Sequence, residues 1–160
     1  MSLESVKEFF ADRMPSAVIE ELSVTTATVA DAALAYGVEP GRIGKTLSVR
    51  VGERVVLVVV AGDARLDNRK SRDALGAKPR MLSAEEVVAL TGHPVGGVCP
   101  FGLATPLQVY CDVSLRRFAE IIPAAGSINS GVRLTPDQIA ALTDAEWVDV
   151  CQERTGGEEA

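Results

Sequence analysis

The sequence predicts a single α+β domain built around a mixed sheet. Three observations favour this class. The 160 residues suit one domain with a sizeable core, the composition of 47% hydrophobic and 24% charged residues is close to the globular average, and helical and strand-like segments are mixed without strict alternation. Because aromatic residues make up only 4%, Val, Leu, Ile and Ala are expected to fill the core. The sequence contains no internal repeat and no interdomain linker.

Helices are expected where apolar residues recur at helical spacing between a capping residue and a stop. These segments are 3–13, 28–36, 67–75, 83–90 and 135–142. The expected caps are Asp67, the Ser83/Glu86 capping box and the Thr135/Gln138 capping box, with Gly37 and Gly76 as left-handed stops.

Strands are expected at 17–22, 43–51, 54–61, 106–112, 119–122, 132–134 and 147–150. From Lys45 onward, Leu47, Val49 and Val51 alternate with Thr46, Ser48 and Arg50. The unbroken valines that follow Arg54 predict burial on both faces, so 43–61 is expected to be the central hairpin. Ser114 is expected to cap a short turn, and 147–150 is expected to be an edge strand. The expected domain covers residues 1–151, and residues 152–160 are expected to form a polar tail.

The most unusual segment is 91–102, which holds four glycines and two prolines. It is expected to be a loop whose uncovered N–H groups could approach a carbonyl or phosphate oxygen. It also contains His93, the one histidine, and Cys99. A tight connection whose glycines only relieve strain fits this composition equally well.

Composition limits the class of protein. A formal net charge of -6 argues against general binding of long nucleic acids, which needs a basic face. A local basic concentration does occur at Arg65, Arg69, Lys70, Arg72, Lys78 and Arg80, either as a solvated helix face or as a phosphate-contacting surface. Neither a signal peptide nor a membrane span is evident, and three irregularly spaced cysteines fit a reduced, cytoplasmic protein without metal or other cofactor.

The residues allow several kinds of chemistry. His93 and Cys99 could form a nucleophilic dyad, but their spacing does not establish contact, and a free cysteine is more often a small buried hydrophobe. One histidine and scattered cysteines cannot supply a metal's first shell. The segment 41–46 does not match a Walker loop, although Lys45 and Thr46 could stand at a pocket edge.

Five blocks of sequence, taken in order, resemble the YbaK/ProX-type aminoacyl-tRNA deacylases and the editing domain of bacterial prolyl-tRNA synthetases. The blocks are T-A-T-V-A-D-A-A-L-A-Y-G-V, R-I-G-K-T-L, V-V-L-V-V-V-A-G-D-A-R-L-D, L-T-G-H-P-V-G-G-V-C-P-F-G and A-A-G-S-I-N-S-G-V-R-L-T-P-D-Q. They run from about Thr26 to Leu142, nearly the whole domain. The resemblance implies a mixed, mostly antiparallel sheet or barrel surrounded by helices.

The resemblance also implies a reaction. Family members hydrolyse the ester of mischarged tRNA, typically proline tRNA carrying Cys or Ala, with a ribose hydroxyl or water as the attacking group. The implied catalytic residues are Lys45, which would meet the terminal phosphate or ribose, and the carbonyl-holding loop Gly96, Gly97, Val98, Cys99 and Pro100. The implied substrate-binding residues are Thr46, Phe101, Gly102 and Ser127.

Two departures bear on the preferred amino acid. Glu20 lies near the position of a Tyr found in some cysteine-specific members, and Cys99 stands where Ser is common. The expected partner is the acceptor end of aminoacyl-tRNA, with a synthetase or elongation factor able to supply further affinity, and a monomer is the default. The alternatives are a non-catalytic module that binds a small ligand or aminoacyl group, and a cysteine hydrolase unrelated to tRNA.

Overall fold

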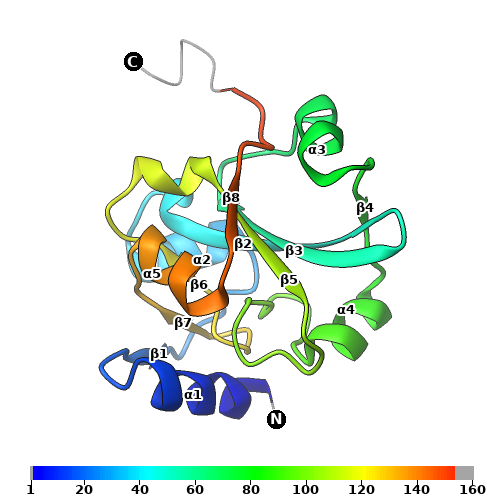
Figure 1. Ribbon diagram of the computed structural model, residues 1–160. Helices are drawn as coiled ribbons and strands as arrows, with labels where there is room; N and C mark the ends of the chain where they lie inside the picture. The colour runs from blue at the N-terminus through cyan, green and yellow to red at the C-terminus, as the bar shows by residue number, and fades with distance from the viewer. Residues whose placement is uncertain (1, 154–160) are drawn as a thin grey trace.

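A computed structural model describes residues 2–153 of the chain and arranges them as an open mixed sheet with helices on both faces (Figure 1). The α-helices are α1 (Ser2–Arg13), α2 (Val29–Tyr36), α3 (Asn68–Leu75), α4 (Ala84–Thr91) and α5 (Pro136–Thr143). The strands are β1 (Ile19–Glu21), β2 (Ile43–Val51), β3 (Arg54–Ala61), β4 (Arg80–Met81), β5 (Gln108–Asp112), β6 (Ile122–Pro123), β7 (Ser130–Val132) and β8 (Glu146–Val148). Two 3-10 helices, η1 (Pro40–Arg42) and η2 (Val113–Arg117), complete the described elements.

The main sheet has the order β4-β2-β3-β5-β8, and β6 pairs with the start of β2. It is antiparallel across β4, β2 and β3, whereas β3, β5 and β8 run parallel, as do β2 and β6. Strands β1 and β7 form a separate antiparallel pair. The mixed α+β class is therefore confirmed, and the sheet ends at β4 and β8 instead of closing into a barrel.

The hairpin of β2 and β3 is central, as the valines predicted. Its two strands pair from Gly44 with Ala61 to Val51 with Arg54 around a two-residue turn. Alternate side chains of β3 enter two different cores. Leu57 and Val59 pack with α1 and α5, whereas Val56, Val58 and Val60 pack with α3. Burial on both faces follows from this arrangement.

The predicted caps are confirmed. Asp67 accepts from the backbone of Lys70, both capping boxes form in full, and Gly37 and Gly76 have φ angles of 67° and 93°. The prediction that Ser114 caps a short turn is wrong. Asp112 caps η2 by accepting from the Ser114 backbone, while the Ser114 hydroxyl accepts from the Ala61 N–H.

Several elements differ from the sequence prediction. Strand β4 is new, the strand expected at 119–122 shortens to β6, and the one expected at 132–134 moves to β7. Cys151, the last residue of the expected domain, is buried and bridges Leu66, and the first residue of the expected tail also contacts the domain, because the Gln152 N–H donates to Arg65 O at 2.8 Å. Residues 154–160 lie outside the described residues. Within residues 2–153, no helix combines the length and apolarity that crossing a membrane requires.

Candidate active site

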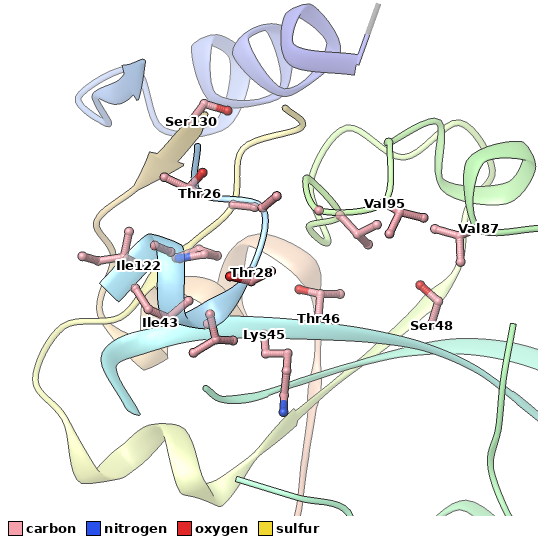
Figure 2. A pocket seen from close by; sticks show the side chains of 18 of the residues that line it. Thr26, Thr28, Ile43, Lys45, Thr46, Ser48, Val87, Val95, Ile122 and Ser130 are labelled. Atoms are coloured by element: carbon pink, nitrogen blue, oxygen red, sulfur yellow. The ribbon is translucent and has the colours of Figure 1, made fainter. Parts of the chain in front are cut away.

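A pocket of about 350 Å³ lies between α2, β2, the β4–α4 segment and two loops, the Gly-rich loop of residues 91–102 and a second Gly-rich loop of residues 124–131 (Figure 2). Its walls are mainly apolar, with several hydroxyls interspersed. The apolar lining includes Val29, Ala32, Ile43, Met81, Val87, Val95, Val98, Ile122 and Pro123, and the hydroxyl-bearing lining is Thr26, Thr28, Tyr36, Thr46, Ser48 and Ser130. No carboxylate side chain lines it. The pocket suits a small, uncharged group.

The floor of the pocket is an open stretch of the β2 edge. Strand β6 pairs with β2 at residues 43–44 and β4 pairs with it at 49–50, which leaves a gap between them. Ser48 O accepts from Leu82 N–H at 3.1 Å across this edge. Because backbone groups two residues apart point to the same side of a strand, the N–H and C=O of Thr46 also face the gap.

The Gly-rich loop forms the opposite wall, and two interactions fix its backbone. The Gly97 N–H donates to Pro94 O at 2.9 Å, and Gly97 O accepts from Gly126 N–H at 3.0 Å, which ties the two Gly-rich loops together. A Cβ on Gly97 would lie 2.8 Å from backbone atoms of Ser127, so only glycine fits there. Among the residues that the structure describes, the Val98 N–H forms no hydrogen bond, and Val98 lines the pocket.

The structure brings His93 and Cys99 together, but inside the core. Both are completely buried, with Cys99 Sγ 3.6 Å from His93 Nε2, and neither lines the pocket. His93 donates from Nε2 to Phe101 O at 2.7 Å and accepts at Nδ1 from the Ser2 hydroxyl at 2.5 Å. Burial lowers the pKa of His93 and raises the pKa of the Cys99 thiol to about 12. The pair therefore anchors the loop as neutral groups and does not form a nucleophilic dyad.

Phe101 and Gly102 are also placed away from the pocket. The Phe101 ring is completely buried against Phe9 and Phe10, with centroids 5.5 and 4.8 Å apart. A Cβ on Gly102 would lie 2.6 Å from Ser5 O, and Gly102 O accepts from the Ser5 hydroxyl at 3.0 Å. Both residues, with the buried Pro100, hold the loop on α1 and the core, so the structure does not bring them to a substrate in the pocket.

Lys45 and Thr46 diverge although they are adjacent. Figure 2 shows the Thr46 side chain rising into the pocket and the Lys45 side chain pointing to the other side of β2. Lys45 Nζ donates to Ala64 O at 3.0 Å. Burial lowers the pKa of Lys45, and the charge of Arg65 lowers it further, against the opposing influence of Asp63 and Cys151. Lys45 thus lines the pocket without its ammonium group reaching into it.

Ser127 lies behind the pocket wall. Its hydroxyl donates to Asn129 Oδ1 at 3.0 Å and contacts the hydroxyl of Ser130 at 2.6 Å, and Ser130 lines the pocket. The resemblance did not single out the wall formed by Thr26, Thr28 and Tyr36. The sequence could have pointed to these three residues, because all of them belong to the first of the sequence blocks that resemble the family.

Two hydroxyl oxygens of the pocket lining are buried without a hydrogen-bond partner among residues 2–153. They belong to Thr46 and Tyr36. Burial raises the pKa of Tyr36, and the negative charge of Glu20 raises it further, so its phenol stays protonated. The described residues contain no group of three or more His, Cys, Asp or Glu side chains that could hold a metal ion.

Fold and site together define a class of protein: a mixed α+β domain whose small uncharged pocket is bordered by a Gly-rich loop. Its one cysteine–histidine contact is buried. Such a site can polarise a carbonyl group by hydrogen bonding, which is the requirement for acyl transfer to a hydroxyl or water. The comparisons with known proteins make the class specific.

Residues 24–142 match the family model of the aminoacyl-tRNA editing domain, and the chain belongs to that family. It is accordingly an aminoacyl-tRNA deacylase, a hydrolase of carboxylic ester bonds. The chain is 48% identical to the uncharacterised protein YwhH of Bacillus subtilis, over 96% of this chain and 99% of that protein. It is 33% identical to the EbsC protein of Enterococcus faecalis, over 71% of each chain; the name of EbsC proposes a Cys-tRNA(Pro)/Cys-tRNA(Cys) deacylase. A crystal structure described as a proposed trans-editing enzyme for prolyl tRNA synthetase superposes with a TM-score of 0.87 at 35% identity, covering 95% of this chain and 98% of that one.

Proposed function

We propose that the chain acts in trans on mischarged tRNA and releases Cys or Ala from proline tRNA. The observation that carries this proposal is the fixed backbone of residues 96–98, with the free Val98 N–H, in the wall of a small uncharged pocket. The names given to EbsC and to the trans-editing structure support the choice of proline tRNA. The proposed place of this reaction is the cytoplasm, where charged tRNA is found.

In the proposed reaction, loop N–H groups hold the ester carbonyl oxygen and stabilise the negative charge that develops on it. The oxygen of a water, assisted by a ribose hydroxyl, attacks the carbonyl carbon. The bond from that carbon to the ribose oxygen breaks, the ribose oxygen takes a proton, and the free amino acid leaves. Because Cys99 is buried as a neutral thiol, no side-chain nucleophile takes part.

The lining supports a small side chain. Apolar groups surround most of the pocket, and no carboxylate is available to neutralise a basic substrate side chain. A buried charge without a partner is strongly disfavoured, so Lys and Arg would be rejected. Cys and Ala, the amino acids that the resemblance implies, meet both conditions.

A basic segment of the chain is the proposed contact for the acceptor end of the tRNA. Most basic side chains of the described residues pair with carboxylates or stack on aromatic rings, but five in one segment form no such ion pair or stacking contact. They are Arg65, Arg69, Arg72, Lys78 and Arg80. Arg65, Arg69 and Arg72 belong to the α3 region, which packs on the face of the sheet opposite Thr46, whereas Lys78 and Arg80 lead directly into Met81, which lines the pocket. Lys78 and Arg80 are therefore the proposed contacts to phosphates near the ester. A synthetase or elongation factor remains a proposed further partner.

Lys45 is proposed to meet the terminal phosphate or ribose. This contact requires its side chain to release Ala64 O and pass the open edge of β2. Lys70 makes a suitable control, because its ammonium also donates to a carbonyl, that of Cys151, but away from the pocket.

The test is release of labelled amino acid from proline tRNA charged separately with Cys, Ala and Pro. We expect rapid release of Cys or Ala, about tenfold slower release by Lys45→Ala, and a rate within about twofold of the wild type for Lys70→Ala. Retention of fold is checked by circular dichroism. If the folded wild type released none of the three, the choice of proline tRNA would be wrong, and binding without hydrolysis would favour the non-catalytic module.

A further inference from the structure

The hydroxyls of the pocket differ in how they are bonded. Thr26 Oγ1 donates to Ile128 O at 3.2 Å, and Thr28 Oγ1 accepts from the Asp31 N–H at 3.0 Å as the cap of α2. Ser130 is bonded to Ser127. Within residues 2–153, the hydroxyls of Thr46, Tyr36 and Ser48 form no hydrogen bond, and the oxygens of Thr46 and Tyr36 are the two that are fully buried.

An unpaired buried hydroxyl destabilises a folded protein, and native structures contain few of them. Packing does not require a hydroxyl at position 46, because Val has nearly the same shape as Thr and strands favour both. The threonine therefore suggests a bonding partner that arrives with the ligand. A ligand group that both donates and accepts would satisfy it best.

The position of Thr46 indicates which part of the substrate it would meet. It rises from β2 toward Thr28 and Val95, across the pocket from the Gly-rich loop (Figure 2). With the ester carbonyl held by that loop, the first polar atom of an amino-acid side chain is separated from the carbonyl carbon only by the α- and β-carbons. That atom falls between the loop and the floor of the pocket, where Thr46 lies.

Tyr36 is less suited to this contact. A Cβ on Gly131 would collide with its hydroxyl, so the phenol lies tight against the β7 backbone. Its ring packs beside Ala32, Ala33, Ile43 and Ile122, in a cluster separate from the Gly-rich loop.

We propose that Thr46 determines amino-acid specificity by hydrogen bonding a hydroxyl or thiol on the β-carbon of the aminoacyl group. The enzyme would then prefer tRNA carrying serine or cysteine over tRNA carrying alanine. This inference rests on the proposed function, and it decides between the two amino acids that the resemblance left open in favour of the one with a polar side-chain atom.

Serine and alanine differ by one oxygen, so the same tRNA charged with each gives the cleanest test. We expect the wild type to favour the seryl ester by about tenfold in kcat/KM, as a site that bonds a substrate hydroxyl discriminates against the analogue lacking it. Thr46→Val should lower kcat/KM for the seryl ester by about tenfold and leave the alanyl ester within about twofold. Thr46→Ser should restore the preference, and Tyr36→Phe should leave it unchanged.

Three results would overturn the proposal: no preference in the wild type, an equal loss on both esters in Thr46→Val, or loss of the preference in Tyr36→Phe alone. An equal loss would place the hydroxyl on the ester or ribose. If the wild type hydrolysed neither ester, the deacylase proposal would fail separately. Calorimetric binding of the non-hydrolysable 3′-amide analogues of seryl- and alanyl-adenosine would still decide the role of Thr46, because a seryl preference lost in Thr46→Val supports it and equal binding contradicts it.

Discussion

The two halves of the Gly-rich loop are continuous in sequence and opposite in environment. Residues 95, 96 and 98 line the pocket, and Val95 is 60% exposed. Residues 99–101 are buried, and Gly102 packs on α1. The difference shows that one motif performs two tasks. Residues 95–98 border the pocket, and residues 99–102, together with the buried His93, fix their position by packing in the core and on α1.

The largest expected effect is on stability, where substitutions in the two parts of the loop should have different costs. Phe101→Ala removes a completely buried ring that packs on two others, so we expect the free energy of unfolding to fall by about 3–5 kcal/mol. Val95→Ala, in the exposed half, should change it by less than about 0.5 kcal/mol. Urea unfolding followed by circular dichroism measures both. Similar losses in the two variants would contradict the division.

The next largest expected effect is on the rate of ester hydrolysis, which should depend on the position of residues 95–98. Gly97→Ala places a Cβ 2.8 Å from backbone atoms of Ser127, and backbone cannot yield by rotating a side chain. The two loops must move apart, which displaces the amides, so we expect kcat/KM for aminoacyl ester hydrolysis to fall by about 100-fold. Gly76→Ala is the control, because Gly76 has a positive φ that disfavours alanine but lies in open space at the end of α3, away from the pocket. That variant should lose stability without losing activity, and an unchanged rate in Gly97→Ala would show that the loop position is not needed.

Much of the fold could be predicted because its signals are local. A capping box such as Ser83 with Glu86 spans four residues, and both of its hydrogen bonds form. Strand β4 could not be predicted, because Arg80 and Met81 become a strand only by pairing with distant residues of β2. The shortening of β6 has the same cause, since its length depends on where β2 begins.

The site was predicted in its segments and less well in its side chains. The loop, β2 and the second Gly-rich loop all meet at the pocket. The alternation along β2 already placed Lys45 on the face of Leu47 and Val49, opposite Thr46, but a linear motif gives no information on which face borders the pocket. Likewise, the burial of Phe101 depends on α1, which lies outside the matched sequence blocks.

The smallest effect concerns the thiol at the boundary between the two halves. Cys99 is buried as a neutral group whose pKa is about 12, against 9.0 for a free thiol. Above pH 9 the unfolded chain loses this proton and the folded chain keeps it, so the stability due to this thiol is complete below pH 9 and declines as the pH rises toward 12. Cys99→Ala should therefore cost about 1 kcal/mol at pH 7. Between pH 7 and pH 10 the difference should change by about 1.4 kcal/mol in favour of the variant, which is then as stable as the wild type or slightly more stable.

Urea unfolding of wild type and Cys99→Ala at both pH values measures this change, and ester hydrolysis at pH 7 completes the comparison. Because the thiol does not reach the pocket, the hydrolysis rate of Cys99→Ala should stay within about twofold of the wild type. Loss of turnover with an intact fold would restore the thiol mechanism and move Cys99 from the anchoring half of the loop to the catalytic half. A stability deficit that does not depend on pH would show that the thiol is reached by water in the folded protein, and the boundary between the halves would then lie beyond Cys99.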